Sequence, residues 1–177
     1  EFCTALFRVL RRDGVNCAVD TSGAVPWKNI EAVLPHTDFV LYDVKHVDDA
    51  RHRAWTGASN QVILANLRAL AQQRVPVELR VPLVPGFNLD APSLRAIAAF
   101  LAEQDGLTGV RLLPYHPTAS KYDALGLSDP MADIPPLTDD QVPLAAGIMT
   151  SFGLRVMSSI PIATGPRPTP APPQSPA

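Results

Sequence analysis

A short apolar run that ends in charged residues places the strongest constraint on the fold of this chain. Phe39, Val40 and Leu41 form an unbroken apolar stretch, and Asp43 and Lys45 follow it closely. An apolar run bounded by polar residues is the pattern of a strand buried on both faces of a parallel sheet. Asp43 and Lys45 are two residues apart, so both side chains face the same way at the carboxyl end. Ligands of open α/β sheets and α/β barrels bind at this edge, so we expect a site there.

The rest of the chain alternates between helix-like and strand-like segments. Amphipathic or capped segments predict helices over residues 2–12, 27–34, 48–55, 60–73, 92–104 and 138–151. Apolar or alternating segments predict strands near residues 15–19, 38–43, 75–84, 110–115 and 154–157. Residues 118–134 show neither pattern and are expected to be irregular. Strands separated by helices indicate a parallel α/β fold, either a barrel or an open sheet.

The composition restricts the class of protein. Of the 177 residues, 46% are hydrophobic, which supports one domain with a core, here residues 1–157. Residues 158–177 are rich in proline and predict a disordered tail. A net charge of −2 argues against nucleic acid and anionic membranes as partners. Two cysteines, no signal peptide and no apolar run of membrane-spanning length predict a cytoplasmic protein. The chain opens without Met inside a predicted helix, so we expect that residues upstream are missing.

Four of the predicted strands end in polar groups. Because right-handed crossovers bring the carboxyl ends of parallel strands to one rim, these groups are expected to gather around one cavity. Arginine binds a carboxylate in a bidentate manner, and carboxylates accept an amine, a ribose hydroxyl or a hard cation. The set therefore suits a zwitterionic or carboxylate-bearing small molecule. Its members are Asp20 with Thr21, Asp43 with Lys45, Arg80 with Glu78, and His116.

Glu78 and Arg80 lie on the face of their strand opposite to Val77, Leu79 and Val81. If the sheet closes, this face lines the barrel interior, where a charge costs several kcal/mol unless it is paired or meets a ligand. A structural Glu–Arg or Asp–Arg pair explains the pattern as well as a binding role does, and the spacing alone leaves both readings open.

The other polar residues also have structural readings. The sequence from Asp20 to Gly23 is typical of a turn followed by a helix cap. Lys45 alone reads as a solvated lysine, although its parity with Asp43 argues against this. His116 alone reads as a partly buried loop histidine.

Three further histidines and both cysteines are assigned no site. His36, His46 and His52 have no matching partners in the sequence and are interpreted as surface residues. Cys3 and Cys17 are fourteen residues apart, which is not a metal-ligand spacing.

A series of short motifs carries more information than any one of them. Their order and spacing resemble the later part of a glycyl-radical-enzyme activating enzyme, such as the pyruvate formate-lyase activating enzymes, from about residue 1 to residue 157. The motifs are Val-Asp-Thr-Ser-Gly at 19–23, Leu-Tyr-Asp-Val-Lys at 41–45, His-x-x-x-Thr-Gly at 52–57, Asn-Leu at 66–67, Arg-Val-Pro-Leu-Val-Pro-Gly-Phe-Asn at 80–88, Leu-Leu-Pro-Tyr-His at 112–116 and Lys-Tyr-x-x-Leu-Gly at 121–126.

The resemblance implies an incomplete partial (β/α) barrel of the radical S-adenosylmethionine superfamily. Such enzymes of anaerobic metabolism cleave S-adenosylmethionine at a [4Fe-4S] cluster, and the resulting radical abstracts hydrogen from a glycine of a partner glycyl radical enzyme. An electron donor such as flavodoxin or ferredoxin is implied too. By motif, Asp43 and Lys45 would lie at the S-adenosylmethionine site, and Arg80 and His116 would hold its methionine part.

The resemblance also implies a monovalent-cation site, formed by Asp20, Thr21 and Asp43 with the backbone of Leu41. One departure is large. The family holds its cluster with Cys-x-x-x-Cys-x-x-Cys, and this sequence contains neither that motif nor the Gly-Gly-Glu segment that follows it. We therefore expect a fragment that lacks the ligands of the cluster and is inactive alone.

Two other functions stay open. An aldolase-like α/β barrel would use Lys45 to form a Schiff base, but this chemistry needs a neutral amine and the neighbouring Asp43 favours the charged one. A non-catalytic binding domain on the same scaffold is the second alternative.

Overall fold

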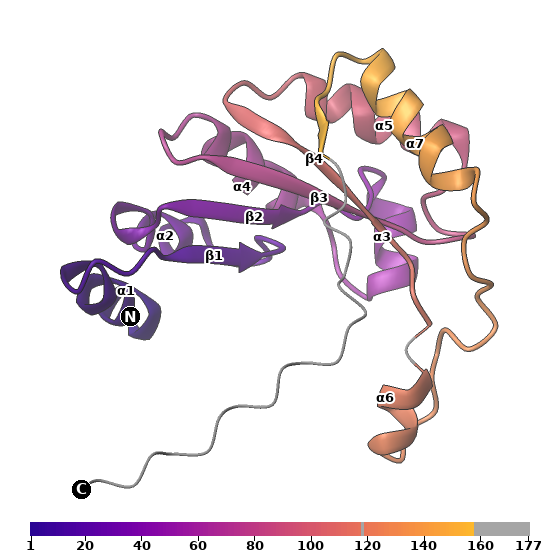
Figure 1. Cartoon of the computed structure of the whole chain (residues 1–177), viewed down its shortest axis with the longest axis horizontal. Coiled ribbons are helices and arrows are strands. Elements are labelled where there is room, and N and C mark those ends of the chain that lie inside the picture. The colour runs from indigo at the N-terminus through magenta and orange to yellow at the C-terminus, as the bar shows by residue number, and fades with distance from the viewer. Residues whose placement is uncertain (118, 158–177) are drawn as a thin grey trace, which may run out of the picture.

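The computed structural model describes residues 1–117 and 119–157, and its centre is one parallel sheet (Figure 1). The strands follow chain order across the sheet, and every neighbouring pair is parallel. They are β1 (Ala18–Thr21), β2 (Phe39–Asp43), β3 (Val77–Leu83), β4 (Leu107–Pro114) and β5 (Val156–Met157). The predicted parallel α/β fold is confirmed. The tail predicted for 158–177 lies outside the described residues.

Helices connect successive strands. They are α1 (Phe2–Arg12), α2 (Trp27–Glu31), the 3-10 helix η1 (Leu34–His36), α3 (Asp49–Thr56), α4 (Gln61–Ala71), α5 (Ala91–Ala102), α6 (Ala119–Ala124) and α7 (Gln141–Ser151). The helix predicted over 27–34 is shorter, because Pro35 has no amide hydrogen to continue the α-helical bonds. The helix α6 falls in the segment predicted to be irregular, and Figure 1 shows it away from the sheet.

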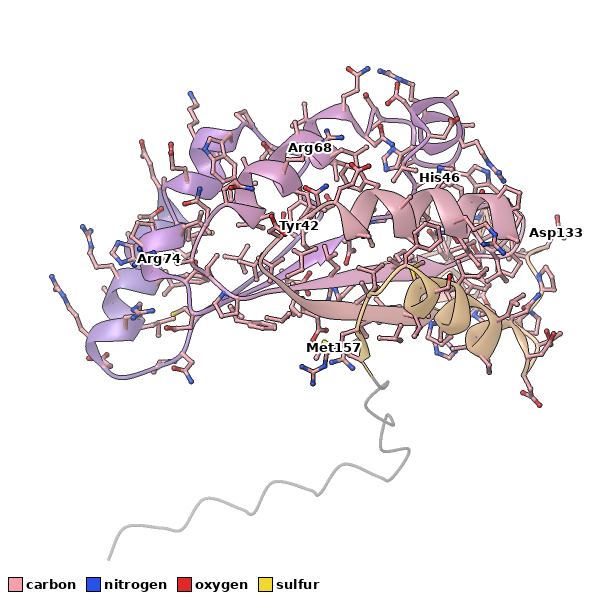
Figure 2. The ribbon with its side chains drawn as sticks, turned by 90° about the horizontal axis from the view of Figure 1, so that it is seen from above. Tyr42, His46, Arg68, Arg74, Asp133 and Met157 are labelled. Carbon is pink, nitrogen blue, oxygen red and sulfur yellow. The ribbon has the colours of Figure 1, made fainter. Side chains whose placement is uncertain are left out.

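One face of the sheet forms the core with the helices. Alternate strand positions supply it, so Tyr42, Leu79 and Val110 are adjacent in the register and are completely buried. Buried residues of α4, α5 and α7 belong to the same hydrophobic cluster. Figure 2 shows Tyr42 on the side of the sheet along which α4 and α5 run. We call this the covered face.

The alternate strand positions point to the opposite face, which we call the open face. It carries five charged residues in neighbouring register positions, and most of them are partly or fully exposed. The period-2 pattern predicted for the strand around Glu78 and Arg80 is therefore correct. The five residues are Asp20, Asp43, Glu78, Arg80 and Arg111.

The helix α1 has the predicted bounds but a different environment from the other long helices. None of its residues is buried, and its apolar side chains Phe2, Leu6 and Val9 are exposed. A groove of about 970 Å³ lies between α1, the edge strand β1 and α2. Within residues 1–117 and 119–157, no helix has the length and apolar character needed to cross a membrane.

Candidate functional site

Arg80 of β3 binds one acidic residue of β2 and one of β1 on the open face. Its Nε donates to Asp43 Oδ1 at 2.8 Å, and its Nη1 donates to Asp20 Oδ2 at 2.9 Å. Its Nη2 donates to the other oxygen of Asp20. Asp43 and Arg80 are paired in the β2–β3 register, so the sheet itself brings these two side chains together. The guanidinium thus has one carboxylate on each side.

Lys45 extends this chain of charges toward the carboxyl end of β2. Its Nζ lies 3.3 Å from Asp43 Oδ2, so Asp43 receives one contact from Arg80 and one from Lys45. The parity argument for Asp43 and Lys45 is therefore correct, and Lys45 is not simply a solvated lysine. Negative and positive groups alternate along the open face in the order Asp20, Arg80, Asp43 and Lys45.

Exposure separates the two carboxylates that bind Arg80. The side chain of Arg80 is 17% exposed and that of Asp43 is 23% exposed, whereas that of Asp20 is 60% exposed. Burial alone would lower the pKa of Arg80, but the hydrogen bond to Asp20 and the charge of Asp43 raise this pKa above its ordinary value. Arg80 therefore stays positively charged, and Asp20 is the partner that a ligand reaches most easily.

A second ion pair lies deeper on the open face. Arg111 on β4 donates from Nε to Glu78 Oε1 at 2.5 Å and from Nη2 to Glu78 Oε2 at 3.0 Å. This bidentate contact raises the pKa of Arg111 above its ordinary value. The structural reading of Glu78 as half of an ion pair is correct. Arg111 was missed, although its position between Val110 and Leu112 gives the same parity signal.

Two of the predicted site residues do not join this chain of charges. Thr21 pairs with Tyr42 in the β1–β2 register, so its side chain belongs to the covered face. His116 is exposed beyond the end of β4 and makes no side-chain hydrogen bond to any other residue that the structure describes. Since Arg111 pairs with Arg80, His116 lies five residues further along the strand direction.

The loop after β1 is a hydrogen-bonded turn, as predicted from its sequence. Thr21 Oγ1 accepts a hydrogen bond from the amide of Gly23 at 2.9 Å. Gly23 has φ +70°, and a Cβ there would lie 1.7 Å from the hydroxyl oxygen of Tyr42, so only glycine fits. Asn66 donates to the carbonyls of Gly23 and Val25 at 2.8 and 2.7 Å. The expected side-chain cap of the next helix is absent from this part of the structure.

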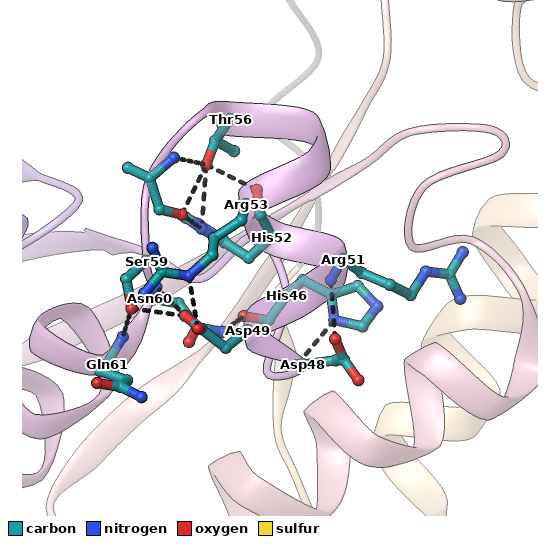
Figure 3. A network of polar contacts seen from close by, with 11 residues as sticks. His46, Asp48, Asp49, Arg51, His52, Arg53, Thr56, Ser59, Asn60 and Gln61 are labelled. Carbon is teal, nitrogen blue, oxygen red and sulfur yellow. Dashed lines mark hydrogen bonds and ion pairs between the residues drawn. The ribbon is translucent and has the colours of Figure 1, made fainter.

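Two histidines interpreted as surface residues are in fact buried. His46 Nδ1 accepts from the amide of Asp48 at 2.9 Å (Figure 3). Its Nε2 lies 3.1 Å from Ser93 Oγ. Burial lowers the pKa of His46, and the charge of Arg51 adds to this effect. His52 Nδ1 lies 2.8 Å from the carbonyl of Ala58. His52 Nδ1 also lies 3.0 Å from Thr56 Oγ1, four residues further on, whereas the contact of His46 with Ser93 joins residues far apart in the sequence.

The relatives reported below are all named as activating enzymes. It is 43% identical over 136 residues to the isethionate sulfite-lyase activating enzyme of Nitratidesulfovibrio vulgaris, covering 75% of this chain and 44% of that relative. It is 34% identical to the (2S)-3-sulfopropanediol dehydratase activating enzyme of Klebsiella oxytoca, covering 76% and 43%. It is 32% identical to the pyruvate formate-lyase-activating enzyme of Staphylococcus aureus, covering 81% and 60%. No protein-family model matches the sequence.

The chain is a homologue of the glycyl-radical-enzyme activating enzymes. The resemblance inferred from the ordered motifs is thereby confirmed. The homologue spans about half the length of the curated relatives that it matches.

Solved structures agree with the fold of this activating-enzyme homologue. A domain of pyruvate-formate lyase-activating enzyme from Bacteroides vulgatus superposes with a TM-score of 0.74 at 24% identity, covering 88% of each chain. A radical SAM methyltransferase from Sphaerobacter thermophilus gives a TM-score of 0.64 at 18% identity, covering 81% of this chain and 41% of that one. At these identities the likeness establishes the shared fold alone.

The residues of the homologue do not fit the iron-sulfur cluster of its family. The sequence has only two cysteines, and Cys3 is exposed on α1 whereas Cys17 is buried before β1. Three thiolates are required for the family's cluster motif, and no group of three or more histidine, cysteine or acidic residues within 1–117 and 119–157 could hold a metal.

Proposed function

We propose that this chain holds S-adenosylmethionine for an activating enzyme that generates a radical on a glycine of a partner glycyl radical enzyme. The observation that carries the proposal is the alternating chain of charges from Asp20 through Arg80 and Asp43 to Lys45. This chain of charges lies on the open face of the sheet, and the protein's homologues are activating enzymes. Neighbouring positive and negative side chains suit a ligand that carries both a carboxylate and an amine.

Each charged group has a distinct part in holding the ligand. Arg80 and Lys45 are cations that attract the carboxylate of the methionine moiety, and Asp43 attracts a positive or hydroxyl-bearing part. Because Asp20 is 60% exposed, it can leave Arg80 without loss of a buried contact when the carboxylate arrives. His116, exposed beyond β4, adds a contact from the rim.

Asp20 then becomes free for a second task. We assign Asp20 and Asp43, with the backbone of Thr21 and Leu41, to a monovalent-cation site; Thr21 takes part through its main chain, because its side chain belongs to the covered face. In this assignment the cation takes over the neutralisation of Asp20 and Asp43 when Arg80 turns to the ligand.

The reaction itself requires groups that this chain does not supply. In the family, the cluster supplies the electron for cleavage of S-adenosylmethionine, and the present residues do not fit that cluster. We therefore propose that residues 1–177 are inactive alone and act as part of a cytoplasmic activating enzyme. Its partners in this proposal are a glycyl radical enzyme and a donor such as flavodoxin or ferredoxin.

Calorimetric titration with S-adenosylmethionine tests the binding role. Wild-type protein should bind, and Arg80→Ala should weaken binding about tenfold or more while the protein stays folded, because the variant loses a charge-assisted contact. Arg68→Ala is the matched control, since Arg68 is an exposed arginine of α4 that lies over the Phe100 ring, outside the chain of charges. Absence of heat with wild-type protein at millimolar ligand, or equal affinities of the two variants, would contradict the proposal.

A further inference from the structure

The main-chain ladder between β2 and β3 stops next to the site. The amide of Val44 still donates to the carbonyl of Arg80 at 2.9 Å. In a parallel ladder the next bond would run from the amide of residue 82 to the carbonyl of residue 44. Residue 82 is proline and has no amide hydrogen, so this bond cannot form. The two strands therefore lose their mutual support one residue before Lys45.

A buried asparagine bridges the strands at this point. Asn88 Nδ2 donates to the carbonyl of Lys45 at 2.8 Å and to the carbonyl of Pro82 at 2.6 Å. Its Oδ1 accepts from the amide of Val84 at 2.8 Å. Asn88 is completely buried, and both polar atoms of its side chain are hydrogen-bonded inside the protein. One side chain thus replaces the ladder that Pro82 interrupts.

A second buried asparagine holds the neighbouring peptide. Asn60 Nδ2 donates to the carbonyl of His46 at 2.8 Å, and Asn60 is buried at the start of α4. The ring of His46 is itself fixed by the amide of Asp48 on one side (Figure 3) and by Ser93 on the other. The backbone at residues 45 and 46 is therefore held by two asparagine side chains, and the ring of His46 is held by Ser93 and the amide of Asp48.

We infer that Asn88 is a positioning residue for Lys45. By holding the Lys45 carbonyl against β3, it aims the Lys45 side chain along the open face, where Nζ meets Asp43. This role rests on the proposed function, because Lys45 is one of the two cations assigned to the ligand carboxylate. It explains why a proline and an asparagine stand six residues apart in the segment 80–88.

The test uses the chain's three lysines, at positions 28, 45 and 121. Reductive ¹³C-methylation keeps their charge, and Lys45→Arg assigns the Lys45 signal in the NMR spectrum. Asp43→Asn then gives the position of that signal without its acidic partner. In Asn88→Asp the donors to both carbonyls are lost while the acceptor for Val84 remains, so the Lys45 signal should move to the Asp43→Asn position.

Thr108→Val is the matched control. It removes a hydrogen bond of 2.7 Å to the carbonyl of Val77, at the opposite end of β3, and should leave the Lys45 signal unchanged. A Lys45 signal that stays at its wild-type position in Asn88→Asp would overturn the positioning role. So would an equal movement in Thr108→Val, because the effect would then be general destabilisation.

Two further measurements complete the test. In wild-type protein the side-chain amide of Asn88 should exchange its hydrogens at least about tenfold more slowly than that of exposed Asn29. Equal exchange rates would refute the bridge even if Asn88→Asp fails to fold. Affinity for S-adenosylmethionine should fall roughly tenfold in Asn88→Asp. If wild-type protein does not bind this ligand, the proposed function fails, whereas the Lys45 signal still decides the positioning role.

Discussion

The two faces of the same sheet are built in opposite ways. On the covered face, side chains such as Leu79 are completely buried among apolar residues of the helices, and their positions follow from packing. On the open face, Glu78 and Arg80 are held by ion pairs to residues of neighbouring strands. We expect the covered face to carry most of the stability and propose that the open face holds the ligand, although their residues alternate along one strand.

The largest effect is expected on the covered face. Leu79→Ala should lower the free energy of unfolding by about 2–5 kcal/mol, because it leaves a cavity in the core. Denaturant unfolding measures this loss, and the exposed Leu144→Ala in α7 serves as the control with little change. S-adenosylmethionine affinity of the folded Leu79→Ala protein should stay near wild type. A marked loss of S-adenosylmethionine affinity in folded Leu79→Ala protein would contradict the view that the covered face does not affect binding.

A smaller effect is expected one residue away, on the open face. Glu78→Gln should lower the free energy of unfolding by roughly 1.5–3 kcal/mol, because it replaces a charge-assisted bidentate contact to Arg111 with a neutral one. The same unfolding experiment measures the change. A loss as large as that of Leu79→Ala would show that the ion pair contributes as much as the core.

The smallest effect is expected for the exposed member of the open face. Asp20→Asn should change the free energy of unfolding by less than about 1 kcal/mol, because an ion pair in contact with water contributes little. Its effect on S-adenosylmethionine affinity should be smaller than that of Arg80→Ala. A stability loss equal to that of Glu78→Gln would contradict the view that Asp20 leaves Arg80 easily.

Residue parity was sufficient to predict the main part of the candidate site. The two-residue spacing of Asp43 and Lys45, and of Glu78 and Arg80, assigned all four side chains to one face. The same rule applied to Arg111 would have found the partner of Glu78. Strand parity gave no information about His46 and His52, because neither lies on a strand; His46 meets Ser93 from another segment, and His52 meets Thr56 and Ala58 at the end of its own helix.

The sequence by itself determined the parallel α/β fold, the alternation of faces and the family, because these depend on local periodicity and on ordered motifs. Only the tertiary structure decided which partner each charge has. Arg80 takes Asp43, its register partner on β2, and reaches diagonally across β2 to Asp20, whereas Glu78 is bound by Arg111. The bridge by Asn88 was likewise invisible in the sequence, since it joins carbonyls that come together only after β2 and β3 have paired.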